Sequence, residues 1–527
     1  MDQNLGTLTT KSQGRSRFYQ RLWNSRSGAI FLLGLISALS LGGYLAYSNA
    51  VYRSGFPLDD AWIHQTYARN LALTGQMAFF PGQPSAGSTA PAWTVLLALG
   101  HLLRINELAW AYFLGWILLW GLAAIAWAGF GMLGFTGRSW GLAAGFLLAV
   151  EWHLVWAAGS GMETLLQAVL ILLVLAGSLW LEKSERQQKP VARAGWPWLL
   201  VGGLVGSSAW VRPDGLTLLV LVGWVAALGA WPTHAKLRIA IYFMAGFTLL
   251  FLPYLWFNLQ LAGEVWPNTF YAKQAEYAVL RAAPLWQRGL AEFYLPLIGV
   301  GILLLPGLII SIAWCLHKRY WPALGGVLWL IGYLGIYALR LPVTYQHGRY
   351  IIPAMPVFFL YGLAGLAGWH ETIPASRRAS LLNRTWSLAC IAILLCFWVI
   401  GARSYAWDVA VIETEMVSTA RWVSRNIPAG ARLAAHDIGA LGYFGGRGIV
   451  DLAGLVSPEV IPFIRDEDAL ESFLREENVD YLVTFPGWYP NLTRRFESFY
   501  TSSGTFSPMS GGENMVVFRW DAAESGN

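Results

Sequence analysis

The feature of the sequence that most constrains the fold is a series of apolar runs, most of them about as long as a bilayer is thick. Since about 20 apolar residues in a helix cross the hydrocarbon core, these runs predict a polytopic α-helical membrane protein with about 11 transmembrane helices. The chain is 56% hydrophobic and 13% charged, which excludes an ordinary soluble domain. The runs are residues 28–47, 108–135, 139–158, 163–182, 196–211, 214–231, 239–259, 295–316, 322–340, 350–368 and 385–402.

Two apolar segments need separate interpretation. The run 28–47 follows a basic tail and resembles a signal peptide, but it is long enough to span and has no clear small-residue cleavage site, so we predict a retained first helix. The segment PAWTVLLALGHLL, residues 91–103, has only 13 residues and is predicted to lie at the membrane interface.

The basic residues set the expected orientation. With the N-terminus inside, the inner segments of the membrane part hold seventeen Lys and Arg residues and the outer loops hold nine, which fits the positive-inside rule. If residues 91–103 spanned the membrane, the bias would reverse. We therefore predict a multi-pass protein of the cell inner or plasma membrane with a cytoplasmic N-terminus. The net charge of +6 belongs to the membrane part and gives no reason to expect nucleic acid as a partner.

The chain divides into three expected regions. Residues 1–28 form a cytoplasmic basic tail, and residues 29–402 form the membrane domain, whose first outer loop covers 48–107. Residues 403–527 hold ten Arg, no Lys and seventeen acidic residues, and segments such as ARLAAHD and NMVVFRW alternate like strands. This pattern predicts a small C-terminal α/β domain on the extracytoplasmic side.

With this orientation, the unusual polar residues gather in the outer loops. The stretch FPLDDAWIHQTYARN, residues 56–70, keeps two adjacent carboxylates in a chain that is poor in charge, which suggests a proton acceptor or a nearby cation. Four more outer loops carry the motifs SGMET, RPDG, EVWPNTFYAK and TYQHGRY. The candidate residues are Asp59, Asp60, His64, Glu163, Arg212, Asp214, Lys273, His347 and Arg349.

Each candidate also has a simpler explanation. A carboxylate of the Asp59–Asp60 pair, Glu163 and Asp214 stand where a helix begins and could cap it. Arginines at helix ends such as Arg349 and Arg212 can anchor a helix at the membrane surface, and Lys273 could be a solvated loop residue. Glu151 and His153 lie in a membrane helix and have no assigned role.

The run DDAWIHQTYARNLALTGQMAFFPGQPSAGSTAPAWTVLLAL resembles the first outer loop of the GT-C glycosyltransferases, polytopic enzymes that use sugars carried on polyprenyl phosphate. The motifs SGMET, RPDG, PNTFYAK and HGRYIIPAMPVF are similar to further motifs of a prokaryotic branch akin to arabinofuranosyl- and mannosyltransferases. The resemblance implies a GT-C fold over most of residues 50–370 and an outer domain containing IGALGYFGGRGIVDLAGL.

The resemblance also implies an activity, namely inverting transfer of a hexosyl or pentosyl group from a polyprenyl-phosphate donor to a hydroxyl of a glycan, lipid or protein. It implies an acidic general base in the first outer loop, for which Asp59 is the first candidate and Asp60 the supporting carboxylate. Cations would hold the phosphate: Arg349 and Lys273 first, then His347, Arg212 and His64. Glu163 and Asp214 would be supporting acids.

Several alternatives stay open at this point. A divalent cation shared by Asp59, Asp60 and Glu163 is possible, and Tyr443, Phe444 and Asp451 of the outer domain could bind the acceptor or cover the cleft. The chain could instead be a membrane lipid or glycan transporter, although transporters place polar groups near the midplane. It could also be a non-catalytic scaffold that presents the outer domain. No Gly-rich nucleotide-binding fingerprint is present.

Overall fold

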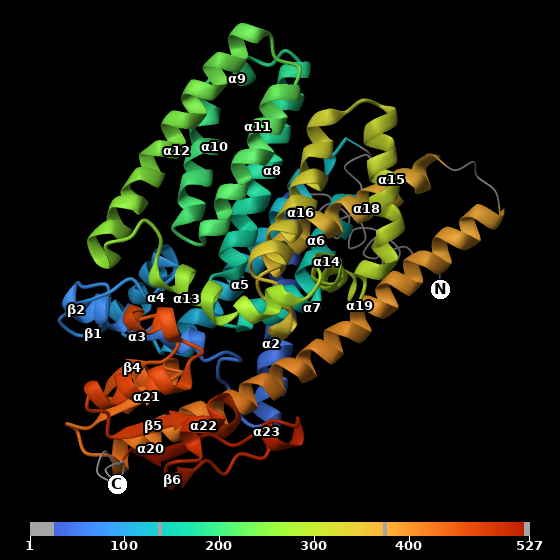
Figure 1. Cartoon of the computed structure of the whole chain (residues 1–527). Coiled ribbons are helices and arrows are strands. Elements are labelled where there is room, and N and C mark those ends of the chain that lie inside the picture. The colour runs from blue at the N-terminus through green and yellow to red at the C-terminus, as the bar shows by residue number, and fades with distance from the viewer. Residues whose placement is uncertain (1–25, 135–139, 373–376, 521–527) are drawn as a thin grey trace, which may run out of the picture.

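The structure, a computed structural model, describes residues 26–134, 140–372 and 377–520. The basic residues before Arg26 and Arg138, which helped to set the expected orientation, lie outside these ranges. A helical part and a smaller C-terminal unit, residues 418–520, meet along one end of the helical bundle (Figure 1). The helices α3 (Asp60–Thr74), α4 (Pro91–Leu102), α13 (Asn268–Glu276) and α14 (Leu285–Tyr294) lie around this junction.

The helical part confirms a polytopic α-helical protein but not the count of eleven spans. Within the described residues, seven helices are long and apolar enough to cross a membrane, or nine if two bent pairs each count as one span. The helices at the expected spans 196–211 and 214–231 are shorter than predicted. The first ends just before the turn that carries Arg212, and the second begins just after it with a 3₁₀ turn. They form α10 (Trp196–Ala209), η3 (Pro213–Thr217) and α11 (Leu218–Leu228). The seven helices are Arg26–Val51, Glu107–Met132, Thr164–Arg186, Thr233–Ala262, Trp321–Arg340, Tyr345–Thr372 and Ser380–Asn426.

Two expected spans are bent. The segment expected as one helix over 139–158 consists of α6 (Gly141–Val150) and α7 (Trp152–Gly159), which meet at 54°. Glu151 stands at the break, where its carboxylate accepts a hydrogen bond from the backbone N–H of Leu154 and pairs with His153 at 2.8 Å. A carboxylate that caps a new helix inside the run explains the bend. The second pair, Leu285–Leu297 and α15 (Gly301–His317), is bent by 104°.

Glycines allow the tightest helix packing in the bundle. A Cβ on Gly202 of α10 would lie 2.0 Å from the carbonyl oxygen of Phe243 in α12 (Thr233–Ala262), and one on Gly246 would lie 2.0 Å from that of Leu199. Gly307 of α15 meets α18 (Met355–Thr372) in the same way. Small residues let helix backbones approach closely in membranes.

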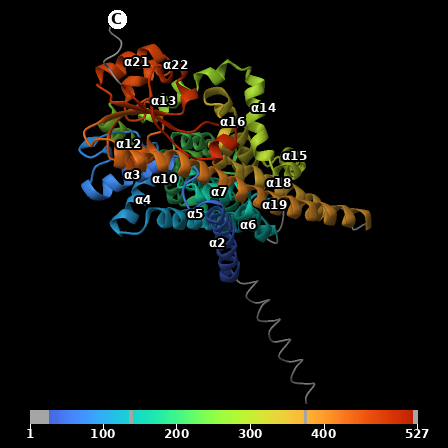
Figure 2. The same ribbon diagram turned by 90° about the horizontal axis from the view of Figure 1, so that it is seen from below.

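The last long helix joins the two parts of the molecule without a loop. Helix α19 (Arg377–Ile412) continues through a π-helical turn, Glu413–Val417, into α20 (Ser418–Asn426). In both views α19 crosses the molecule from the flank of the bundle to the C-terminal unit (Figure 1, Figure 2).

The C-terminal unit contains a five-stranded sheet of order β4-β3-β5-β7-β6. Strand β3 (Arg432–Ala435) pairs in parallel with β4 (Gly448–Asp451) and β5 (Tyr481–Thr484), whereas β7 (Val516–Arg519) is antiparallel to β5 and to β6 (Ser498–Thr501). Successive residues of β3 alternate between two cores: Leu433 and Ala435 pack with the main core, and Ala434 packs with a second one.

The remaining elements are short or complete the bundle. A two-stranded hairpin, β1 (Ala78–Phe80) and β2 (Gln83–Pro84), follows α3. The other α-helices are α2 (Arg26–Val51), α5 (Glu107–Gly129), α8 (Thr164–Arg186), α9 (Pro190–Arg193), α16 (Trp321–Arg340), α17 (Tyr345–Gly348), α21 (Glu467–Glu476), α22 (Pro490–Thr493) and α23 (Phe506–Met509). The other 3₁₀ turns are η1 (Phe130–Met132), η4 (Ala278–Ala282), η5 (Leu295–Leu297), η6 (Ile352–Ala354), η9 (Pro458–Phe463) and η10 (Pro486–Trp488). A second π-helical turn is η8 (Leu441–Gly445).

Candidate active site

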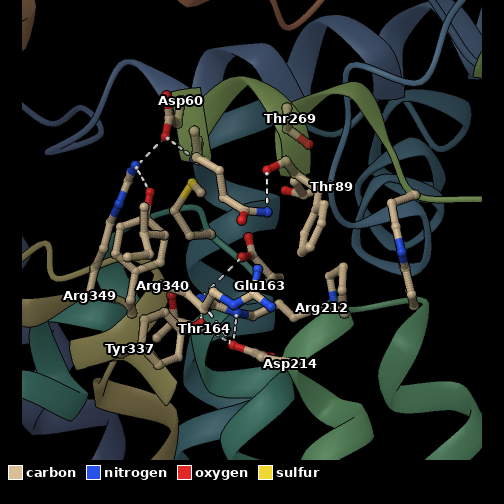
Figure 3. Close-up of a pocket in the computed structure, with 18 of the residues that line it drawn as sticks. Asp60, Thr89, Glu163, Thr164, Arg212, Asp214, Thr269, Tyr337, Arg340 and Arg349 are labelled. Atoms are coloured by element: carbon tan, nitrogen blue, oxygen red, sulfur yellow. Dashed lines mark hydrogen bonds and ion pairs between the residues drawn. The ribbon is translucent and has the colours of Figure 1, made fainter. Parts of the chain in front are cut away.

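A cavity of about 400 Å³ opens where five connecting segments converge at one end of the helical part, and it is called the donor cavity after the ligand expected from the sequence resemblance. Most of its wall is apolar, with side chains such as Ile63, Met162 and Phe270. Its charged lining residues come from all five segments that the sequence placed in outer loops (Figure 3). These residues are Asp60, His64, Glu163, Arg212, Asp214, Lys273, Arg340 and Arg349.

Asp60, the first residue of α3, forms one charged edge of the donor cavity. Its Oδ2 lies 2.7 Å from Nη1 of Arg349 and 3.7 Å from Nζ of Lys273. Burial alone would raise the pKa of the Asp60 carboxyl, but the charges of Arg349 and Lys273 outweigh it and hold that pKa well below its usual range. The three side chains thus form a charged wall, named here the Asp60 wall.

A left-handed turn presents Arg349 to this wall. Gln346, His347 and Gly348 have φ values of 52°, 58° and 68°. Left-handed geometry at the two non-glycine residues costs about 1–2 kcal/mol each, and such strain is typical of functional sites. The turn places the Arg349 guanidinium against the Tyr350 ring, at 4.9 Å from its centroid, with only 7% of the residue exposed.

A second group of charges closes the opposite side of the donor cavity. Arg212 lies 3.1 Å from Asp214 and 3.6 Å from Glu163, and it donates a hydrogen bond to the hydroxyl of Tyr337. His64 lies 3.5 Å from Glu163. Burial alone would raise the pKa of Glu163, but His64 and Arg212 lower it to about 2. These residues hold one another in place.

Arg340 differs from the other cations of the cavity. Arg340 is the last residue of α16 and is exposed. Its side chain forms no hydrogen bond or ion pair with another residue in the part of the chain that the structure describes. Arg340 is not among the residues that the sequence pattern pointed to. The available signal was a lone arginine at the end of an apolar run, which is also typical of a membrane anchor.

Two sequence candidates lie outside the donor cavity. Asp59 accepts hydrogen bonds from the backbone N–H groups of Gly439 and Ala440, at 2.6 and 2.8 Å. Burial raises the pKa of Asp59 to about 6, although these two hydrogen bonds oppose the shift. His347 pairs with Asp408 of α19 at 2.8 Å and lines none of the cavities described here.

The capping explanation is wrong for three of the carboxylates. Asp59 and Glu163 occupy N-cap positions but accept no capping hydrogen bond through their side chains. Asp214 instead binds Arg212 and the hydroxyl of Tyr333. For these carboxylates, side chains such as Arg212 and Tyr333 and backbone groups of the distant Gly439–Ala440 loop therefore replace the donors at the start of the helix.

The residues of the C-terminal unit that could bind the acceptor or cover the cleft, Tyr443, Phe444 and Asp451, make contacts within the protein. The rings of Tyr443 and Phe444 lie 5.0 and 4.7 Å from that of Trp62 in α3. Arg69 donates a hydrogen bond to the carbonyl of Tyr443. Asp451 is fully buried and accepts backbone hydrogen bonds from Ala453 and its neighbours. These residues dock the unit on α3 and order its loop.

The charge pattern does not fit the possible divalent cation. Among the described residues, no group of three or more His, Cys, Asp and Glu side chains is arranged to hold a metal ion. Asp60 already faces Arg349 and Lys273, and Glu163 faces Arg212 and His64. Positive side chains therefore occupy the places that a cation would take beside both carboxylates.

Comparisons with known proteins bear on the fold. A family described as a domain of unknown function (DUF8728) matches residues 404–518, and no curated protein matches the chain by sequence. The oligosaccharyltransferase AglB from Archaeoglobus fulgidus, solved with an inhibitory peptide and a dolichol-phosphate, is 13% identical with a TM-score of 0.59, covering 89% of this chain and 70% of its own.

The structure of ArnT from Cupriavidus metallidurans bound to undecaprenyl phosphate is 15% identical with a TM-score of 0.54 and covers 94% of this chain and 98% of its own. At these identities the likeness concerns the fold. It confirms the fold that the resemblance implied: the chain has the fold of the GT-C glycosyltransferase superfamily.

Proposed function

We propose that the protein transfers a sugar from a polyprenyl-phosphate carrier to a hydroxyl acceptor, with inversion at the anomeric carbon. The observation that carries the proposal is the donor cavity, in which an acidic side chain and several cations border an apolar space. The reaction would take place at the outer face of the membrane, with the C-terminal unit extracytoplasmic.

The donor cavity suits a ligand with an anionic head and an apolar tail. Its lining includes four basic side chains and three carboxyl groups, so its net charge favours an anion. Among the described residues, the side chain of Arg340 has no hydrogen-bond or ion-pair partner. The buried Nε of Arg349 likewise has no hydrogen-bond partner within the described part of the chain. We assign the phosphate to Arg340, Arg349 and Lys273, whereas Arg212 and His64 pair with Glu163 on the opposite side of the cavity. The solved ArnT structure contains undecaprenyl phosphate, a ligand of this class.

Asp60 is the general base in this mechanism. It lines the donor cavity and also the space on the other side of the wall, whereas Asp59 lines only the latter. For this reason we propose Asp60 as the base in place of Asp59, the first candidate from the sequence, and we assign to Asp59 the role of holding the Gly439–Ala440 loop through two hydrogen bonds. A bound phosphate would share the positive charge of Arg349 and Lys273, which would raise the pKa of Asp60 toward a useful value.

The proposed reaction is a single displacement. The acceptor oxygen attacks the anomeric carbon while its proton passes to Asp60. The bond between that carbon and the phosphate oxygen breaks, and its electron pair leaves with the phosphate. Arg349 and Lys273 stabilise the negative charge on the departing phosphate in a site whose wall is mostly apolar.

The first experiment separates binding from turnover. The protein in lipid nanodiscs is mixed with undecaprenyl phosphate, and bound lipid is measured by native mass spectrometry for wild type, R340Q, R349Q and the control R425Q. Arg425 is an exposed arginine of the C-terminal unit. We expect weaker binding for the first two variants only.

Turnover is then measured with polyprenyl-phosphate pentoses and hexoses as release of free polyprenyl phosphate. Binding without any release would favour a lipid transporter, and absence of both would favour a scaffold. Either result would overturn the proposal.

A further inference from the structure

A second space lies on the other side of the Asp60 wall, between the helical part and the C-terminal unit. It has two lobes of about 640 and 490 Å³. The first lobe reaches Glu276 and Tyr277 at the C-terminal end of α13, and the second reaches Trp407 and Val411 of α19. Both lobes share six lining residues, so they form one groove: Asp59, Asp60, Gln346, Arg349, Asp437 and Trp488.

The shared residues of the C-terminal unit come from the carboxyl ends of neighbouring parallel strands. Asp437 follows β3 by two residues, and Trp488 follows β5 by four. Parallel strands present their carboxyl ends at one edge, where ligands bind in α/β sheets. This edge faces Asp60, so the sheet is oriented to hold a molecule beside the proposed base.

The groove has the opposite charge to the donor cavity. Its two lobes are lined by seven carboxyl groups and three basic side chains. Such a surface repels an anionic acceptor and prevents the acceptor from competing for the phosphate site. The charge therefore excludes an anionic occupant, and the choice of a neutral one rests on the aromatic ring and the free oxygen described next.

The groove also has a rigid aromatic surface. The side chain of Trp488 remains 48% exposed, while its ring packs edge-on against His436, with ring centroids 4.8 Å apart. His436 is itself held by the hydroxyl of Tyr489 at 2.7 Å and by Glu276 at 3.3 Å. An immobilised ring of this kind offers an apolar face at low entropic cost.

A free hydrogen-bond acceptor lies in both lobes. The Oδ2 atom of Asp437 is buried and has no hydrogen-bond partner among the described residues. Buried polar atoms normally have partners, so this oxygen is available to a ligand that carries hydroxyl groups. A flat ring beside a free carboxyl oxygen combines the two features that a sugar needs: a surface for its C–H face and a hydrogen-bond partner for its O–H groups.

We infer that this groove binds a neutral glycan chain as the acceptor, with sugar units on both sides of Asp60 and with Trp488 and Asp437 in direct contact with them. Each lobe falls within the range of about 300–1,000 Å³ typical of small-molecule sites, so the two lobes together hold several sugar units. The inference rests on the proposed function and names the acceptor class for that reaction.

Chain-length dependence of binding tests the inference. Full-length protein in nanodiscs is titrated calorimetrically with neutral oligosaccharides of one to six units from glucan, mannan, galactan and arabinan. For at least one series, we expect affinity to rise at least tenfold from one unit to four. We expect W488A to lose at least tenfold and D437N three- to tenfold of that affinity.

The matched control is F499A. Phe499 is also 48% exposed and belongs to the same unit, but it lines neither lobe. Its affinity for the oligosaccharides should equal that of wild type. Undecaprenyl phosphate binding should be unchanged in all three variants, which shows that the donor cavity is intact and separates this test from that of the proposed function.

Four results would overturn the inference: no binding in any series, affinity independent of length, equal effects of W488A and F499A, or tighter binding of uronic-acid oligosaccharides or peptides. If the wild-type protein does not bind undecaprenyl phosphate, the proposed function is overturned, whatever the result of the oligosaccharide titrations.

Discussion

Replacing Asp60 by asparagine tests the proposed base while keeping the shape of the side chain. Asparagine cannot accept the proton of the acceptor hydroxyl, and general-base assistance is typically worth about 10²–10⁴ in rate. Since each factor of ten corresponds to about 1.36 kcal/mol of activation free energy, D60N should raise the barrier by about 3–5 kcal/mol.

The same substitution should tighten donor binding. The Asp60 carboxylate lies 2.7 Å from Arg349, a proposed phosphate ligand. A negative charge about 8 Å from the phosphate, at an effective dielectric constant of about 20, opposes binding by about 2 kcal/mol. Because salt screens part of this repulsion, the Kd for undecaprenyl phosphate should fall several-fold. The assay is single-turnover release of polyprenyl phosphate, with lipid affinity measured on the same preparation.

The control is D59N, which alters the neighbouring carboxylate that binds Gly439 and Ala440. We expect it to weaken acceptor use while leaving the Kd for undecaprenyl phosphate unchanged. Thermal unfolding of both variants checks that the fold persists. Turnover of D60N above one-tenth of wild type, or weaker lipid binding by D60N, would refute the reasoning.

Three further results are expected. R340Q should raise the KM for the donor about three- to tenfold with little change in kcat, because Arg340 has no structural partner within the described residues; an equal loss in kcat would contradict its assignment. Activity should survive EDTA treatment, since Arg349 and Lys273 neutralise Asp60; loss of activity that Mg²⁺ or Mn²⁺ restores would contradict this account. Burial raises the pKa of Asp437 to about 8, so the folded state binds more protons than the unfolded state between about pH 4 and 8, and stability falls as pH rises through this range. D437N should therefore raise the melting temperature at pH 8 but not at pH 4; a melting temperature unchanged at pH 8 would refute the shift.

The sequence predicted the cavity better than it predicted the contacts within it. The lengths of the apolar runs placed the segments of Asp60, Glu163, Arg212 and Lys273 at one end of the bundle, and the structure brings them together. The local expectation of helix caps was wrong, because a carboxylate pairs with whichever donor the tertiary fold supplies, such as Gly439 for Asp59.

Other features had no readable signal in the sequence. The bend at Glu151 depends on a cap inside an apolar run, where the hydrophobic period continues on both sides. Asp437 and Trp488 lie 51 positions apart, and only the parallel pairing of β3 and β5 places them in one groove. In the sequence, Arg340 is indistinguishable from an ordinary membrane anchor. What distinguishes it, a side chain with no hydrogen-bond or ion-pair partner among the described residues, is seen only in the structure.

The unbroken passage of α19 into α20 has a mechanical consequence. A 36-residue helix is about 54 Å long. Because α19 continues into α20 without a loop, a change in its tilt would also move the start of the C-terminal unit. Within the apolar stretch of the span Ser380–Asn426, only a small share of the residues is covered by the rest of the chain, so this stretch is the part of the helix on which bilayer thickness would act. Because Trp407 and Val411 of this helix line the second lobe of the groove, we expect a change in bilayer thickness that alters the tilt of the helix to alter the width of that lobe as well.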